Sequence, residues 1–236
     1  CLKRLRAGWR MVQGVDAHSR KAAQRVLKTA AQALSGQRDA DVRQTTWRRV
    51  RAAAQALPAA QLATLDALVE PPLHPVPLAV ERGALQALLA REAALRADAQ
   101  LTACRWSQLQ QGRKHTAAKN RYWAEQALGG IDNETYHRWR RWAKHLLYQR
   151  QLAAALRGRP PGQRQLLLKQ LGSELGRKHD LDLLAAYLQQ RAENPPQRQA
   201  LQAIQPVIAA LNDEQQTNIA ELYRRFDRRR ARATTP

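Results

Sequence analysis

Hydrophobic residues recur at helical spacing from the start of the chain. Leu2, Leu5, Trp9 and Val12 lie three or four residues apart, which places them on one face of a helix. No segment shows the alternation of apolar and polar residues that is typical of a half-buried strand. Ala, Leu, Gln and Arg dominate the chain and all favour helices. The pattern therefore predicts an all-α fold.

Glycine, proline and capping residues divide the first half into helices. We expect a helix over about residues 16–34 that ends at Ser35-Gly36, because glycine suits a left-handed cap. Asp39 or its neighbour can cap the next helix. Four prolines within residues 71–77 break helical structure and mark a linker between the halves.

The second half shows the same kind of punctuation. A long helical stretch is expected over about residues 78–128, with an interruption near Gly112 and an end at Gly129-Gly130. Asp132 or Asn133 can cap the helix that follows. The proline pairs at 160–161 and 195–196 separate the remaining helices, so the expected architecture is a set of helical bundles joined by short loops.

Two pairs of segments are similar at one fixed offset of 141 residues. Residues 3–5 match residues 144–146, and residues 34–42 match residues 175–183. The shared offset indicates a duplicated helical unit. We therefore expect two pseudo-repeated antiparallel helical bundles that share a basic groove or channel. The expected parts are a first repeat over residues 1–70, a linker and long middle helices over residues 71–130, and a second repeat over residues 131–236.

Charge narrows the class of partner. The 236 residues contain 40 Lys and Arg against 19 Asp and Glu, a formal net charge of +21. Such an excess favours a polyanionic partner, which can be nucleic acid, an anionic membrane surface or polyphosphate. No apolar run is long enough to span a membrane, and two cysteines without a signal peptide predict a soluble, cytoplasmic protein. Because the first residue is Cys1, we expect the natural protein to have an additional N-terminal segment.

Basic residues also follow helical spacing. His137, Arg140 or Arg141, Lys144 and Tyr148 fall on one stripe of a helix, and a solvated basic face is the alternative interpretation. An apolar stripe on the same segment would pack against the rest of the protein. The apolar stripe consists of Trp139, Trp142, Leu146 and Ala153. We expect the tryptophans to occupy core positions.

The order of these motifs resembles the CHAD domain, a helical domain built of two similar halves. Residues 136–148 follow its His-x-x-Arg-Lys-type helix, and residues 175–183 resemble its later His-Asp element. In the first half, residues 3–10 and 37–42 look like the corresponding pieces, and by the offset the first motif histidine lies before Cys1. The resemblance extends over nearly the whole chain, which we expect to be a single CHAD-like domain.

The resemblance implies non-catalytic binding of inorganic polyphosphate, without a cofactor. It also implies a triphosphate-processing enzyme or polyphosphate granules as further partners. For the residues outside the motifs a solvated surface position remains the alternative. The expected polyphosphate contacts are Lys3, Arg4, Arg6, Arg10, Arg20, Arg25, Lys28, Arg38, Arg105, Arg113, Lys114, His137, Arg140, Arg141, Lys144, His145, Tyr148 and His179.

Two carboxylates and two other functions need separate consideration. Asp39 and Asp180 repel phosphate, so we assign them structural roles at predicted helix starts or beside arginines. The His179-Asp180 doublet is found in metal-dependent phosphohydrolases, but the repeat places Arg38 at the matching position. A nucleic-acid-binding protein that uses the same basic surface and the Arg-rich segment 224–232 is the stronger alternative.

Overall fold

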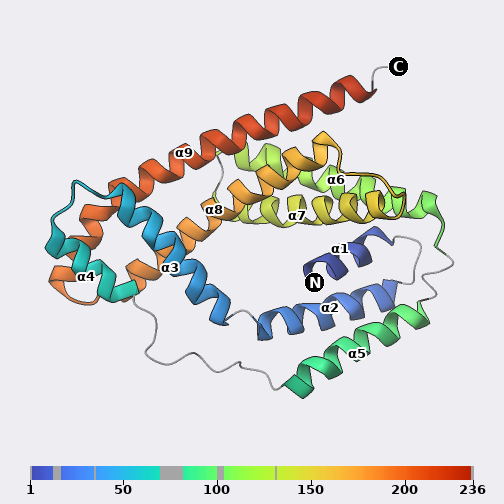
Figure 1. Ribbon diagram of the computed structural model, residues 1–236, viewed down its shortest axis with the longest axis horizontal. Coiled ribbons are helices and arrows are strands. Elements are labelled where there is room, and N and C mark those ends of the chain that lie inside the picture. Colours follow the sequence, from blue (N-terminus) through green and yellow to red (C-terminus); the bar gives the residue numbers. More distant parts are fainter. Residues whose placement is uncertain are drawn as a thin grey trace.

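Nine α-helices and no strands make up the described part of the chain, which covers residues 2–12, 17–34, 36–69, 82–99, 104–130 and 132–234 of a computed structural model (Figure 1). The all-α prediction is confirmed. The helices are α1 (Leu2–Met11), α2 (Ala17–Ala33), α3 (Gly36–Ala53), α4 (Ala59–Val69), α5 (Arg82–Asp98), α6 (Trp106–Leu128), α7 (Asn133–Ala155), α8 (Gln163–Arg191) and α9 (Pro195–Thr234).

Some predicted helix ends are confirmed. The carboxylate of Asp132 accepts a hydrogen bond of 2.6 Å from the backbone N–H of Thr135 and so caps α7. Gly130 follows α6 with a φ of 80°, a conformation that glycine adopts without strain. The proline pair 160–161 lies between α7 and α8, and the pair 195–196 forms the start of α9.

Other predicted breaks are wrong. Gly36 is the first residue of α3 instead of a cap on α2, and Ser35 and the linker at 71–77 lie outside the described residues. Gly112 does not interrupt α6, because the break between α5 and α6 comes earlier. Its lack of a side chain serves packing: a Cβ atom at this position would collide with the backbone carbonyl of Met11. Helix α1 therefore approaches α6 closely at this point.

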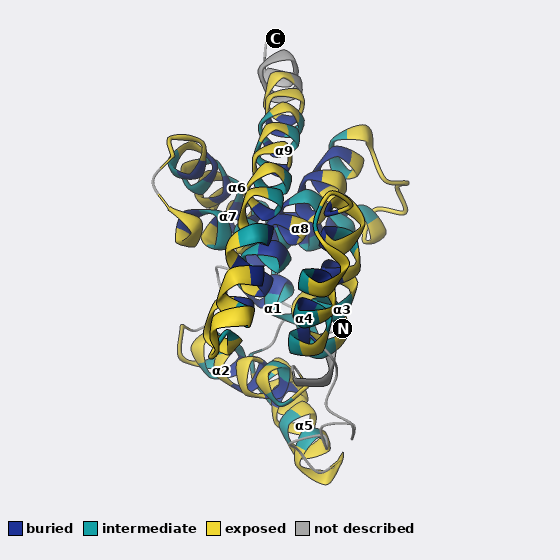
Figure 2. Cartoon of the chain, turned by 90° about the vertical axis from the view of Figure 1, so that its left-hand side faces the viewer, coloured by how far each residue is buried: buried dark blue, intermediate teal, exposed yellow. Residues whose placement is uncertain are grey.

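Two apolar cores lie along opposite halves of α8. The first is formed by α3, α4, the C-terminal half of α8 and the N-terminal half of α9, around Leu65, Leu184 and Ile204. The second is formed by α6, α7, the remaining half of α8 and the C-terminal half of α9, around Trp139 and Leu171. Buried residues accordingly follow the inward faces of α7, α8 and α9 (Figure 2).

A third, smaller core fixes α1 against its neighbours. Trp9 of α1 packs with Leu27 of α2, and its indole Nε1 donates a 2.8 Å hydrogen bond to Glu92 of α5. The buried Glu92 carboxylate also forms an ion pair of 3.1 Å with Arg96. Because α1 additionally packs on α6 and α7, this short helix joins α2 and α5 to the rest of the protein.

Helix α8 is continuous across the segment that resembles the His-Asp element. Asp180 therefore lies in the middle of a helix, and the prediction that it marks a helix start is wrong. Asp39 does lie in the first turn of α3, as expected. The segment 224–232 belongs to α9, although its side chains from residue 229 onward lie outside the described residues.

Candidate anion-binding site

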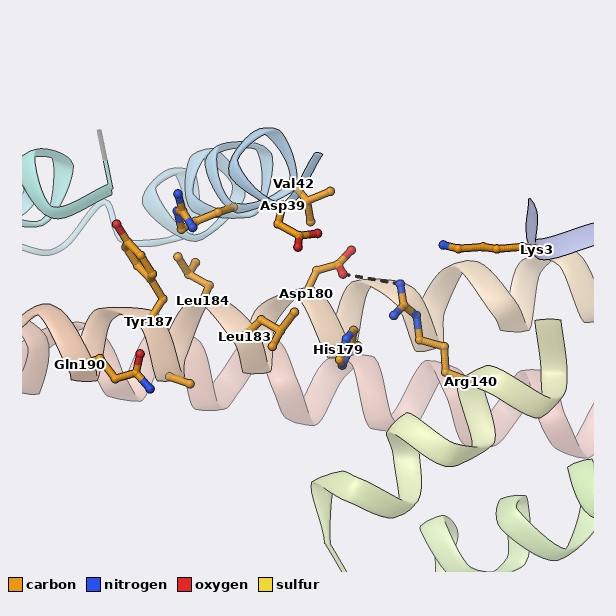
Figure 3. Close-up of a pocket in the computed structure, with 12 residues that line it drawn as sticks. Lys3, Asp39, Val42, Arg140, His179, Asp180, Leu183, Leu184, Tyr187 and Gln190 are labelled. Atoms are coloured by element: carbon orange, nitrogen blue, oxygen red, sulfur yellow. Dashed lines mark ion pairs between the residues drawn. The ribbon is translucent and has the colours of Figure 1, made fainter. Parts of the chain in front are cut away.

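The first cavity of the site lies where α1, α3, α7 and α8 meet. Lys3 enters from α1, Arg140 from α7 and His179 from α8 (Figure 3). Asp39 of α3 and Asp180 of α8 also line it (Figure 3). The cavity therefore collects basic groups from three helices next to two carboxylates.

An ion pair holds Arg140 in this cavity. Its Nη2 atom lies 3.7 Å from Asp180 Oδ1, with 17% of the arginine side chain and 27% of the aspartate side chain exposed. A partly shielded carboxylate limits the rotamers that the guanidinium can adopt. Asp180 thus lies beside an arginine and positions it, which was one of the two structural roles expected for this residue.

Two histidines face each other beside Arg140. The Nδ1 atoms of His137 and His179 lie 3.3 Å apart, a geometry in which one ring must donate and the other accept. Burial lowers the pKa of His179 to about 4, with further lowering by Arg140, His137, Lys144 and Lys178. Burial also lowers the pKa of His137. The pair is therefore neutral at pH 7, and the positive charge comes from the neighbouring lysine and arginine side chains.

Four further basic groups converge from α1 and α7. A second cavity is lined by Arg10, Arg141 and His145, together with the Glu134–Arg138 ion pair of 2.8 Å. Burial lowers the pKa of His145 to about 3, with further lowering by Arg10, Arg6 and Arg141. Burial also lowers the pKa of Arg6 and Arg10, and in both cases Arg141 adds to the effect. The cations of this cavity therefore lie close enough to repel one another.

The arginines of this cavity have few anionic neighbours. Among the described residues, no carboxylate lies within ion-pair distance of Arg6, Arg10 or Arg141. The Nε atoms of Arg6 and Arg10 are buried and have no hydrogen-bond partner. Arg6 and Arg10 are partly buried, and partly buried guanidinium groups without a counter-charge are costly, so the arrangement suits an external anion.

A third cavity, of about 600 Å³, continues from the second between α1, α2, α6 and α7. Arg10 and Trp142 line both cavities, and the Arg10 guanidinium lies 5.1 Å from the centre of the Trp142 ring. Trp142 is therefore a wall residue and not the core residue that was expected. The third cavity is also lined by Arg20, Lys21, Arg25 and His115.

We use the name central cluster for the cationic residues of these three cavities and the basic side chains that act on them. Of the expected contacts, the structure brings eleven together here, although His137, His145 and His179 contribute no charge at pH 7. The expected contacts in the central cluster are Lys3, Arg6, Arg10, Arg20, Arg25, His137, Arg140, Arg141, Lys144, His145 and His179. The central cluster also includes Lys21, Arg43 and Arg138, which were not expected.

Other expected contacts lie elsewhere. Arg4 and Tyr148 line a largely apolar pocket between α1 and α7, so the stripe that was expected to include Tyr148 divides between two surfaces. Arg105 precedes α6 and is exposed, and Lys28 is exposed on α2. The side chain of Arg38 lies outside the described residues. Arg113 and Lys114 line a separate cavity between α6 and α9.

Several lining residues were missed by the sequence interpretation. Arg43 stands four residues after Asp39 on α3, and its guanidinium lies 4.1 Å from the centre of the Tyr187 ring. Lys21 stands between Arg20 and Arg25. Arg43 follows Asp39 by four residues and Arg25 follows Lys21 by four, and this spacing was the available signal because residues four apart share a helix face. Nothing in the sequence indicated that these faces would meet α7 and α8.

The described part of the chain is thus an all-helical protein with a cluster of cations between its helices. A comparison with protein families identifies the class: the family model of the CHAD domain matches residues 1–167, and the chain belongs to this family. The matched region ends within α8, before His179. No curated protein and no solved structure matches the chain.

The described helices were also compared with the requirements of a membrane span. None of them is both long enough and apolar enough to cross a bilayer.

Proposed function

We propose that the protein binds inorganic polyphosphate without catalysing a reaction, and that its three basic cavities act as one groove for the polyanion. The observation that carries this proposal is the convergence of Arg6, Arg10 and Arg141 from two helices without a carboxylate partner among the described residues. An extended anion would relieve their mutual repulsion, which a water-filled groove does only in part.

The chemistry of the lining favours a chain of phosphates. Arginine forks bind phosphate oxygens bidentately, and Lys3 at one end and Lys21 at the other supply point charges. The second and third cavities share Arg10, and the consecutive residues Arg140 and Arg141 line the first and the second cavity, respectively. A repeating anion with no base to recognise can use such a series of similar contacts along its length.

The duplication proposed from the sequence is supported by how the helices pair. Residues 3–5 of α1 and 144–146 of α7 match at the offset of 141 residues, and α1 packs against α7. Asp39 and Asp180 are related by the same offset, and both line the first cavity (Figure 3). We propose that two similar units face each other and that each contributes one wall of the groove.

A catalytic role is not proposed. The His179-Asp180 doublet has its carboxylate beside Arg140 and its imidazole against His137. Within the described residues there is no group of three or more side chains suited to hold a metal ion. We propose inorganic polyphosphate as the ligand, with polyphosphate granules or a triphosphate-processing enzyme as the setting in which binding is used.

A competition titration tests the proposal. Labelled long-chain polyphosphate is titrated with the protein and displaced by RNA or double-stranded DNA at several salt concentrations. The test variant is Arg6→Gln/Arg10→Gln/Arg141→Gln. The matched control, Arg82→Gln/Arg91→Gln/Arg198→Gln, removes the same formal charge from exposed positions that line none of the three cavities.

We expect the test variant to lose polyphosphate affinity by roughly 10²-fold or more, since each charge-assisted contact contributes about 1.5–3 kcal/mol. The control variant should lose less than about threefold. Equal losses in the two variants would mean that net charge alone drives binding. Tighter binding of RNA or DNA than of polyphosphate would overturn the proposal in favour of a nucleic-acid-binding protein.

A further inference from the structure

A second basic cluster lies outside the groove, in a cavity of about 410 Å³ between α6, α7, α8 and α9. Five cations from three helices line it, together with one carboxylate and two aromatic rings of α9. We call this set the α9 cluster. Its charged members are Arg113, Lys114 and Arg121 of α6, Arg150 of α7, Arg164 of α8 and Asp227 of α9.

Helix α7 separates the two clusters. Arg150 follows Arg141 by nine residues, which corresponds to about half a rotation around the helix and roughly 13 Å along it. Leu146, one turn before Arg150, lines the same cavity and also belongs to the second apolar core. The two basic clusters therefore lie on opposite faces of α7, with packed side chains between them.

Arg150 is the central group of the α9 cluster. Its Nε atom is buried without a hydrogen-bond partner, and no described residue forms an ion pair or hydrogen bond with its guanidinium. Burial lowers the pKa of Arg150 to about 10, with further lowering by Arg164 and Arg113. A partly buried guanidinium that is surrounded by cations is expensive to maintain without an anion.

An aromatic ring helps to fix the neighbouring guanidinium. Arg164 lies 4.8 Å from the centre of the Phe226 ring, and Tyr223 lies 6.4 Å from Phe226 between ring centres. A guanidinium held flat on an aromatic face loses little entropy when its N–H groups bind an oxyanion. The cavity thus has a positioned fork beside the buried charge of Arg150.

The charge of the cavity indicates the class of ligand. Five cations against the single carboxylate of Asp227 leave four positive charges. A carboxylate or a single phosphate would neutralise only part of this charge, whereas a triphosphate group carries about four negative charges at neutral pH. We propose that the α9 cluster is a second anion-binding site that takes a short oligophosphate group, and that it binds independently of the groove.

The experiment uses the full chain carrying the groove substitutions Arg6→Gln/Arg10→Gln/Arg141→Gln, so that binding at the groove does not contribute. Inorganic tripolyphosphate is titrated by calorimetry at low salt. We expect one equivalent to bind, and Arg150→Gln/Arg164→Gln in the same background to weaken it by at least tenfold. The matched control is Arg82→Gln/Arg91→Gln, which removes the same charge from exposed positions on α5.

Two further measurements keep the result interpretable. Because Arg150 is partly buried, Arg113→Gln/Lys114→Gln provides a second variant at the rim of the cavity, and it should also weaken tripolyphosphate. Comparable binding of ATP would show that the phosphates alone are recognised, and preferential binding of ATP would assign the source to a nucleotide. Absence of tripolyphosphate binding in the groove variant, or an unchanged affinity in both cavity variants, would overturn the proposal whether or not the groove binds polyphosphate.

Discussion

The cations on the two faces of α7 are surrounded by different types of residue. On one face, Arg10 and Arg141 lie among three histidines, His137, His145 and His179, and near the carboxylates of the first cavity. On the other face, the described lining of the α9 cluster contains arginine and lysine, no histidine and two aromatic rings. Both faces gather like charges at partly buried positions.

Because of this difference, the charge of the two clusters should depend differently on pH. His137, His145 and His179 are neutral at pH 7 and can acquire charge as the pH falls, whereas the guanidinium groups of the α9 cluster keep their charge throughout. The groove should therefore change its charge with pH and bind a long chain through many contacts. The α9 cluster should behave as a small site of constant charge.

The largest expected effect concerns pH and His145. Its pKa of about 3 in the folded protein lies below the ordinary value of 6.5, so the unfolded chain binds the proton more readily between these values. Stability should thus be greatest above pH 6.5 and fall as the pH decreases, with His145 contributing a loss of roughly 3 kcal/mol between pH 7 and pH 4. Urea denaturation across this range measures the effect.

His145→Gln should remove much of this pH dependence because glutamine does not titrate. His18→Gln, which replaces a histidine at an exposed position on α2, is the control. An unchanged slope in His145→Gln would show that this histidine is not the group that titrates.

The second largest effect should be a difference between the two clusters in how strongly ligand affinity depends on salt concentration. Each neutralised phosphate releases counterions, and the dependence on salt grows with the number of contacts. Between 50 and 200 mM salt, we expect long-chain polyphosphate to weaken by roughly 10²-fold at the groove and tripolyphosphate by about tenfold at the α9 cluster. Titrations at four salt concentrations check this, and equal slopes would contradict the difference in contact number.

Gly112→Ala tests whether the placement of α1 matters to the groove. The new Cβ atom would collide with the carbonyl of Met11, so α1 must shift and we expect a loss of about 2 kcal/mol in stability. Polyphosphate binding should weaken because Arg6 and Arg10 lie on α1. Gly83→Ala is the control, because nothing lies within 4 Å of a Cβ there. Equal stability of the two variants in urea denaturation would contradict the close approach.

The smallest expected effect is on the stability of the free protein, when substitution of one arginine relieves repulsion between neighbouring cations. Arg6→Gln and Arg150→Gln should each raise the stability of the free protein at low salt, by about 0.5–1 kcal/mol, because each removes one cation from a group of like charges. The gain should shrink in 0.5 M salt. A loss of stability in either variant, measured by thermal unfolding, would show that its arginine is held by stabilising contacts.

Much of the helical architecture could be predicted from local signals. The cap at Asp132 and the glycine pair after α6 were readable because both act within one turn of the chain. The same reasoning failed at Gly112 and in the segment around Asp180. In both places a residue that often marks a helix boundary serves a contact with a distant part of the chain, Met11 in one case and Arg140 in the other.

The candidate site was predictable only as stripes on single helices. His137, Arg140 and Lys144 share a face because helical geometry repeats every 3.6 residues, and the sequence alone determined this. Only the tertiary structure decided that α1 brings Arg6 and Arg10 to this face, that Tyr148 lines an apolar pocket and that Arg150 belongs to a separate cluster. The physical reason is that periodicity depends on neighbours within a turn, whereas the meeting of two faces depends on how distant apolar stripes pack.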